Sequence, residues 1–291
     1  MTKTRNEGNW YGKRGMKWLK RGLLGLVGIV ILVFIVIYAG SEYVIRKNHV
    51  AELRVLVLPV AETVPGEGER LAQVFGCYRG CHGRHMEGQV AFDEPPFFKA
   101  VAPGLKDAMR KYSPAQLEAI IRQGVRPDGR SVWGMPAGSF AGMTDQHLAA
   151  ILGFISDYPE HEREAELPDS KFYLLGRVAV LTGLFEAEAT VATRFKPLNI
   201  ATLDEPLAHG QYLAMNVCSE CHGITLEGLE DFTPSLQVAK AYSREQFGRL
   251  MSEGIGLGDR DLGLMSEVAK MRFSQLKDNE VDDLYNFLHS R

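Results

Sequence analysis

The sequence predicts an all-α protein in which one N-terminal transmembrane helix precedes two tandem domains of similar size. Two observations lead to this fold class: an uncharged apolar stretch near the N-terminus, and a repeat within the rest of the chain. The composition agrees, since 45% of the 291 residues are apolar and 24% are charged. A slightly negative mean hydropathy excludes a membrane protein with many spans, and the apolar fraction excludes a disordered chain.

The formal net charge of −3 combines two segments of opposite sign. Residues 1–21 contain seven basic residues and one acidic residue, whereas the remainder contains 26 basic and 35 acidic residues. A basic N-terminal segment of net charge +6 therefore precedes an acidic body of net charge −9. Because the body has no basic excess, we expect no nucleic acid among its partners.

Residues 22–41 are 20 consecutive positions without a charged side chain. A helix rises about 1.5 Å per residue, so this stretch is roughly 30 Å long, which matches the hydrocarbon thickness of a bilayer. The preceding lysines and arginines predict that residues 1–21 lie in the cytoplasm and that the chain after the span lies outside it.

A cleaved signal peptide is the alternative interpretation of the apolar stretch. Its apolar core is ordinarily shorter, and Tyr38-Ala39-Gly40-Ser41 matches a small-x-small cleavage site poorly. We therefore expect a retained single-pass anchor in membrane lipid. The corresponding location is the inner membrane of a bacterial cell, with the two domains in the periplasm.

The chain after the anchor contains an internal duplication. The segment CYRGCHG at 77–83 returns as CSECHG at 218–223, and a Glu-Gly pair lies five residues after each histidine. A proline two residues before a leucine follows in both copies, at Pro103 and Pro234. The repeat predicts two domains, at 64–158 and 204–291. Residues 159–203 form a linker, in which 172–185 is apolar enough to pack on the domains.

Each copy contains the same helix signals. Ser113 and Ser243 are each followed three residues later by glutamine, a pattern that predicts a capping box. Gly124 and Gly254 fit left-handed helix ends. Helices over about 67–75 and 207–217 lead to the cysteines. Amphipathic helices that start near residues 144 and 278 close the two copies.

The four cysteines are spaced like haem attachment sites. In C-x-x-C-H the two thiols form thioethers with the haem vinyl groups and the histidine ligates the iron, and Cys218, Cys221 and His222 have this spacing. Cys77, Cys81 and His82 have one extra residue between the cysteines, which the flexibility of Gly80 accommodates. Attachment through Cys81 alone, a disulfide, and a zinc site remain alternatives, although structural zinc needs four ligands.

The soluble chain resembles two tandem class I c-type cytochrome domains, and the whole chain resembles a membrane-anchored dihaem cytochrome c. The resemblance covers about 64–158 and 204–290 and implies two covalently bound haem c groups. It implies that a methionine late in each domain is the sixth iron ligand, and Met135-Pro136 matches the family's Met-Pro pair. It also implies that Pro103 and Pro234 orient the two iron-ligating histidines.

The methionine of the second copy has two candidates. Met271 lies in a segment that resembles the ligand loop of mitochondrial-type cytochromes. The repeat favours Met265, because Gly124 to Met135 and Gly254 to Met265 are equal separations. The remaining histidines have no counterpart at a ligand position and are interpreted as structural or surface residues.

An iron with histidine and methionine ligands has no open position for a substrate, so we expect an electron carrier with no catalytic residues. Its partners would be a redox protein donor and acceptor, as other subunits of a respiratory or dehydrogenase complex. One alternative is a dihaem enzyme such as a peroxidase, if a sixth ligand is displaceable. Another is a haem-bearing assembly module that docks a dehydrogenase subunit.

Overall fold

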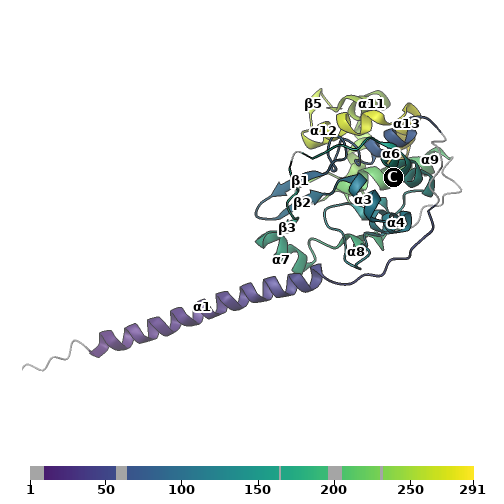
Figure 1. Ribbon diagram of the computed structural model, residues 1–291. Helices are drawn as coiled ribbons and strands as arrows, with labels where there is room; N and C mark the ends of the chain where they lie inside the picture. Colours follow the sequence, from purple (N-terminus) through teal and green to yellow (C-terminus); the bar gives the residue numbers. More distant parts are fainter. Residues whose placement is uncertain (1–9, 57–63, 164, 196–204, 230–231) are drawn as a thin grey trace, which may run out of the picture.

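The computed structural model has a mostly helical body from which one long helix projects (Figure 1). It describes residues 10–56, 64–163, 165–195, 205–229 and 232–291. Residues 1–9 of the predicted cytoplasmic segment therefore lie outside the described residues. So do part of the predicted linker and the domain boundary predicted at residue 204.

The projecting helix, α1 (Trp10–Ile45), contains the predicted apolar stretch. Its side chains from Met16 to Val36 are exposed and make no packed contact with the body. Among the described residues, α1 is the one helix that is long and apolar enough to cross a membrane. Its last turns differ from the rest, because Ser41 is fully buried against the body.

The two halves of the body contain helices in a similar order. The first half contains α2 (Glu67–Val74), α3 (Leu105–Lys111), α4 (Pro114–Gln123), α5 (Ala137–Phe140) and α6 (Asp145–Asp157). The second half contains α9 (Pro206–Leu213), the π-helical turn η2 (Ala214–Cys218), α10 (Ser219–His222), η3 (Leu236–Ala241), α11 (Arg244–Glu253), α12 (Leu264–Met271), η4 (Phe273–Gln275) and α13 (Asp278–Ser290). In each half, a helix leads to the cysteines and a 13-residue helix, α6 or α13, ends the segment.

The repeated helix signals are confirmed. Ser113 and Ser243 both form complete capping boxes with the glutamine three residues later, at the starts of α4 and α11. Gly124 and Gly254 end these helices in the left-handed conformation, with φ of 67° and 70°. The local sequence alone therefore fixes the limits of both helices.

The expectation of an all-α fold is wrong for residues 89–102. They form an antiparallel hairpin, β1 (Gln89–Glu94) and β2 (Phe98–Ala102), and β3 (Lys171–Phe172) pairs with β2 to complete a three-stranded sheet. Phe98 is buried, and its ring centroid lies 4.6 Å from that of Phe172. Because β3 comes from the linker, no local pattern shows this pairing. A second, shorter hairpin joins β4 (Ile255–Gly256) and β5 (Arg260–Asp261).

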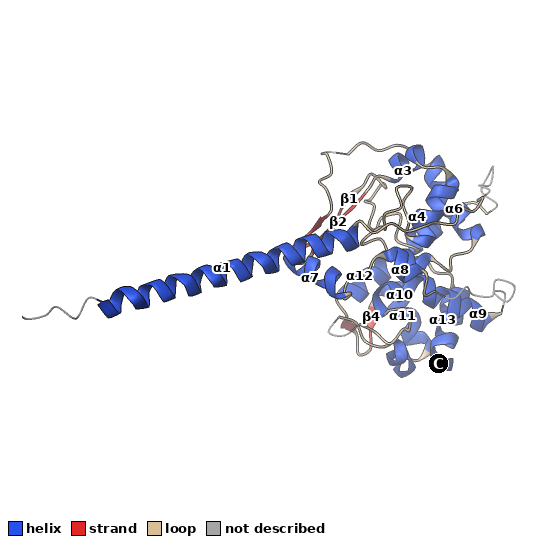
Figure 2. Ribbon diagram, turned by 90° about the horizontal axis from the view of Figure 1, so that it is seen from below, coloured by secondary structure: helices blue, strands red, loops and turns tan. Residues whose placement is uncertain are grey.

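The linker packs on the first half of the body and on α1. In both views, α7 (Leu174–Thr182) lies beside the C-terminal end of α1, close to the β1–β2–β3 sheet (Figures 1 and 2). The next helix, α8 (Glu188–Ala192), packs against α4 and α5. Residues 165–195 of the linker thus pack as part of the first half.

The two halves share one hydrophobic core. Buried side chains from the first half, such as Leu148 and Ile151 on α6, belong to the same cluster as Tyr212 and Leu284 from the second half. Because the core is continuous, separating the two halves would expose buried apolar side chains of both to water. The halves are therefore expected to unfold together.

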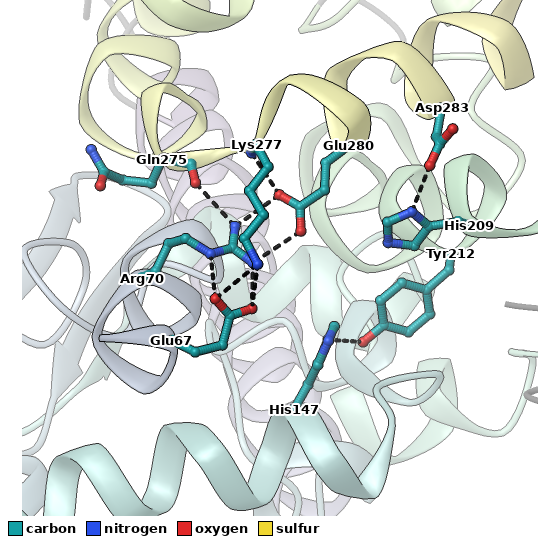
Figure 3. A network of polar contacts seen from close by, with 9 residues as sticks. All are labelled: Glu67, Arg70, His147, His209, Tyr212, Gln275, Lys277, Glu280 and Asp283. Carbon is teal, nitrogen blue, oxygen red and sulfur yellow. Dashed lines mark hydrogen bonds and ion pairs between the residues drawn. The ribbon is translucent and has the colours of Figure 1, made fainter. Parts of the chain in front are cut away.

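Charged side chains bridge the halves beside this core (Figure 3). Arg70 on α2 donates two hydrogen bonds to Glu280 on α13, at 2.8 and 2.9 Å, and also pairs with Glu67 on its own helix at 2.7 Å. Lys277 pairs with Glu67 from the other side at 3.1 Å. The side chain of Glu280 is 7% exposed, so these pairs form a network that water screens weakly.

His147 on α6 meets Tyr212 on α9 in the same interface (Figure 3). The His147 Nδ1 atom lies 2.8 Å from the Tyr212 hydroxyl oxygen. Burial lowers the pKa of His147 from 6.5 to about 4, so the folded protein holds this ring neutral. The hydrogen bond of Arg70 lowers the pKa of Glu67 from 4.5 to about 2.

Mild acid should therefore weaken the fold. The unfolded chain binds a proton at His147 below about pH 6.5, whereas the folded chain binds it only near pH 4, so the free energy of unfolding falls as the pH drops through that window. Denaturant titrations of the full chain in detergent at several pH values measure this slope. His147→Gln should flatten the slope between pH 6.5 and 4. The exposed control His161→Gln should leave it unchanged, and an unaltered slope in His147→Gln would contradict the assignment.

Candidate haem sites

The second cysteine motif lies on two short helical turns. Cys218 is the last residue of η2, and Cys221 and His222 lie on α10. None of the four cysteines of the chain, all within the described residues, forms a disulfide, so the disulfide alternative finds no support. Burial raises the pKa of the Cys218 thiol to about 12 and that of Cys221 to about 11.

His222 is held in the form that ligates a metal. Its Nδ1 atom lies 2.8 Å from the carbonyl oxygen of Pro234. A carbonyl oxygen only accepts, so Nδ1 carries the proton and the lone pair of Nε2 is free. Burial lowers the pKa of His222, which keeps the ring neutral. A neutral imidazole oriented by a backbone carbonyl is the usual arrangement for a metal-ligating histidine.

The first motif places its histidine in the same way. The Nδ1 atom of His82 donates to the carbonyl oxygen of Pro103 at 2.8 Å, and burial lowers the pKa of the ring. The chain between the two bonded residues is longer here, with 21 positions from His82 to Pro103 against 12 from His222 to Pro234. The β1–β2 hairpin accounts for this difference, so an insertion has left the histidine–proline hydrogen bond unchanged.

The extra residue between Cys77 and Cys81 is accommodated differently from what the sequence suggests. The left-handed backbone angle falls on Arg79, with φ of 55°, and not on Gly80. Gly80 is required instead for a close approach, because a Cβ atom there would lie 2.4 Å from the carbonyl oxygen of Gly76. The same carbonyl accepts from the backbone N–H of Cys81 at 3.1 Å.

One buried arginine lies between the two motifs. Arg272, whose side chain is 9% exposed, donates from Nε to the carbonyl oxygen of Val74 at 3.0 Å and pairs with Glu220 at 2.9 Å. Val74 ends α2 just before the first motif, and Glu220 lies inside the second motif. The remaining nitrogen of the guanidinium, the second Nη atom, has no protein partner.

Arg272 lies within electrostatic range of every cysteine. Burial raises the pKa of all four thiols, and the positive charge of Arg272 opposes that rise at each of them. The Cys81 thiol in turn raises the pKa of Cys221. The structure therefore gathers the two cysteine motifs around one guanidinium, at the contact between the two halves.

The three candidate methionines have different surroundings. Met135 precedes α5 and Met265 lies in the first turn of α12, and both are half-buried against the shared core. Met271, at the end of α12, is 40% exposed, and its backbone carbonyl accepts a hydrogen bond from Gln73 at 2.7 Å. A methionine that ligates iron in a buried site must pack against the core, and Met265 does so.

The linker supports the segment that follows Met135. Glu188 on α8 accepts a hydrogen bond from the backbone N–H of Gly138 at 2.9 Å, and Ala189 N–H donates to Ser131 Oγ at 3.0 Å. Burial raises the pKa of Glu188 to about 7. The residues on both sides of Met135 are thus fixed by a helix that lies about 50 residues away in the sequence.

Two of the remaining histidines pack against each other. The rings of His85 and His161 stack at 4.2 Å between centroids, and His85 Nδ1 lies 3.0 Å from the Tyr158 hydroxyl. Within the described ranges, no group of three or more His, Cys, Asp or Glu side chains is placed to hold a metal ion. The zinc alternative therefore finds no support there.

A comparison with known families identifies the second half of the body. The cytochrome c family model matches residues 207–291, which include Cys218, Cys221 and His222. Residues 207–291 form a cytochrome c domain. A domain of this kind binds haem c covalently and carries electrons. The match covers less than a third of the chain, and a search of curated proteins finds no significant match.

The residues of this cytochrome c domain fit haem c. Two unpaired thiols at the required spacing precede a buried, neutral histidine whose Nε2 is free. The first half offers the same kinds of donor, two thiols and a histidine oriented by proline, at a spacing longer by one residue.

Sequence reasoning missed Arg272, Glu220 and Glu188. Glu220 lies 52 positions from Arg272, and the Val74 carbonyl lies 198 positions from it. The pairing of such distant residues leaves no periodic or motif signal. The one available hint is that Arg272 directly follows Met271. The resemblance of this segment, residues 271–277, to a ligand loop directs attention to Met271 instead.

Removing the Arg272 side chain should destabilise the contact between the halves. Arg272→Met leaves the Glu220 carboxylate and the Val74 carbonyl without a partner, at an expected loss of about 3 kcal/mol in the free energy of unfolding. Arg249→Met removes an exposed partner of Asp259 and should cost less than about 1 kcal/mol. Denaturant titrations of the full chain measure both, and equal losses would contradict the central position of Arg272.

Proposed function

We propose that this protein is a membrane-anchored dihaem cytochrome c that carries single electrons between redox partners on the periplasmic face of a bacterial inner membrane. The cytochrome c domain at 207–291 accounts for one haem. The second haem, the anchor and the location are the parts that the proposal adds.

One observation carries the assignment of the second haem to Cys77, Cys81 and His82. The His82–Pro103 hydrogen bond has the same atoms and the same 2.8 Å length as the His222–Pro234 bond of the cytochrome c domain. A chance CxxxCH sequence has no reason to orient its histidine in this way. The equivalent capping boxes and helix ends that follow each motif add to this support.

The anchor is supported by the structure at the end of α1. The segment at residues 38–41, which matches a signal-peptide cleavage site poorly, lies inside a continuous helix that runs to Ile45. Ser41 is fully buried against the body, and Arg177 donates to its hydroxyl at 3.0 Å. A helix that is packed at its end and exposed along its apolar length is better explained as a retained span than as a removed leader.

The residues at each site have separate tasks. Haem c supplies a one-electron couple at its iron when it is bound. Cys218, Cys221 and His222 would hold it in the second half, and we assign Met265 as the other iron ligand there. Met135 has this role in the first half. Met135 and Met265 both pack against the shared apolar core, which lowers the polarity on that side of each site and limits rearrangement when the charge changes.

The meeting of both cysteine motifs around Arg272 supports an electron path within the chain. It brings the two attachment segments to one contact, so an electron accepted at one site has a short route to the other. The anchor confines this route to the membrane surface, which raises its effective concentration near membrane-bound partners. Other subunits of a respiratory or dehydrogenase complex are the partners that this arrangement fits.

The haem count tests the proposal directly. Mass spectrometry of the purified full chain should show two covalently attached haems. A Cys218→Ala and Cys221→Ala double variant should retain one, and a Cys77→Ala and Cys81→Ala double variant should retain the other. A single haem on the unmodified protein, lost with the first double variant, would show that the CxxxCH segment does not bind haem.

The sixth ligand of the second site is tested by spectroscopy. Met265→Ala should remove the methionine–iron charge-transfer band of one haem, because its sulfur is the ligand, whereas the matched variant Met271→Ala should leave both bands. The unmodified reduced protein should not bind carbon monoxide. Loss of the band in Met271→Ala would reverse the assignment, and rapid carbon monoxide binding would favour an enzyme with an open site.

A further inference from the structure

Helix α7 of the linker has no polar face. Gly176, Ala179 and Val180 are buried against the body and α1, while Leu175 and Leu181, which flank this buried strip, are 50% and 38% exposed. Arg177 is the only charged residue in the helix. A helix that is apolar on its buried and its exposed sides is expected only where no water reaches the exposed side.

Arg177 is directed toward α1 and does not face solvent. It donates to Ser41 Oγ and to a carboxylate oxygen of Glu42, each at 3.0 Å, and its guanidinium carbon lies 4.8 Å from the centre of the Tyr38 ring. On the same side, the Leu181 side chain fills the space beside Gly40, where an added Cβ would lie 2.8 Å from it. These contacts fix α7 against α1 (Figures 1 and 2).

The contacts also fix the level of α7 along α1. Gly40 and Ser41 are the last residues of the uncharged stretch 22–41, and Glu42 is the first charged residue after it. In a membrane-spanning α1, this position is where the hydrocarbon core meets the lipid headgroups. Tyr38 and Tyr43, which are 47% and 79% exposed, are the residue type that is enriched at that level.

Further exposed apolar side chains extend the surface beside α7. Leu184, just after the helix, is 84% exposed, and Leu181 is 38% exposed. Phe97, at the tip of the β1–β2 hairpin, is 42% exposed, and its carbonyl oxygen accepts from the backbone N–H of Tyr173 at 3.0 Å. We refer to Phe97, Leu175, Leu181 and Leu184 as the α7 apolar face.

We propose that the α7 apolar face lies in the interfacial layer of the bilayer that α1 crosses. The inference rests on the anchor in the proposed function. Lipid is the occupant that the structure favours, because the face adjoins the exposed apolar surface of α1 and reaches the level at which that surface ends. The body would then lie on the membrane surface in a single orientation, held by α1, α7 and the Arg177 contacts, instead of changing its orientation freely at the end of α1.

Photo-crosslinking in the full chain tests this placement. The photoreactive residue p-benzoylphenylalanine replaces one side chain at a time in protein reconstituted into phosphatidylethanolamine and phosphatidylglycerol vesicles. Leu184 probes the α7 apolar face, Leu32 probes the exposed length of α1, and Leu264, which is 54% exposed on α12, is the matched control. An unchanged haem absorption spectrum shows that each variant is folded.

Lipid adducts at Leu184 and at Leu32, with none at Leu264, are the expected result. Adducts at Leu32 without adducts at Leu184 would overturn the inference and leave the anchor intact. Absence of lipid adducts at Leu32 would show that α1 does not span the bilayer and would overturn both. A protein adduct at Leu184 in native membranes, in place of lipid, would mean that a partner subunit covers this face.

Discussion

The arrangement of the two halves depends on where the guanidinium of Arg272 is placed. A charge that is taken out of water must find opposite charge or hydrogen-bond acceptors nearby, and its partners here come from both halves. The Val74 carbonyl at the end of α2 and the Glu220 carboxylate inside the second cysteine motif supply them. The end of α2 and the second cysteine motif must therefore keep their positions relative to Arg272, which directly precedes η4. The continuous core beneath them fixes the same positions.

This constraint has a consequence for function. The four cysteines lie around a single positive charge, so the two cysteine motifs converge at the contact between the halves. Separate domains on a flexible linker would leave the distance between the two cysteine motifs variable. Here residues 165–195 of the linker are folded against the first half, where Glu188 supports the segment after Met135. The shared core and the Arg272 contacts therefore hold the two motifs at a constant separation.

The first half departs from the second in related ways. Its cysteines are spaced by one extra residue, and nine more positions separate its histidine from the orienting proline. The added segment is the β1–β2 hairpin, which pairs with β3 and supports α7. The departure from the repeat therefore joins the body to the linker and to the end of α1.

The sequence by itself determined the features that depend on neighbouring residues. Capping boxes at Ser113 and Ser243, the glycine helix ends and the CxxCH motif are local, so their residues predict them directly. The tertiary structure decided what depends on distant residues: the sheet that includes β3, the steric role of Gly80, the support from Glu188, and the position of Arg272 between the motifs. These contacts join positions about 50 to 200 apart or depend on backbone packing, and neither leaves a pattern along the chain.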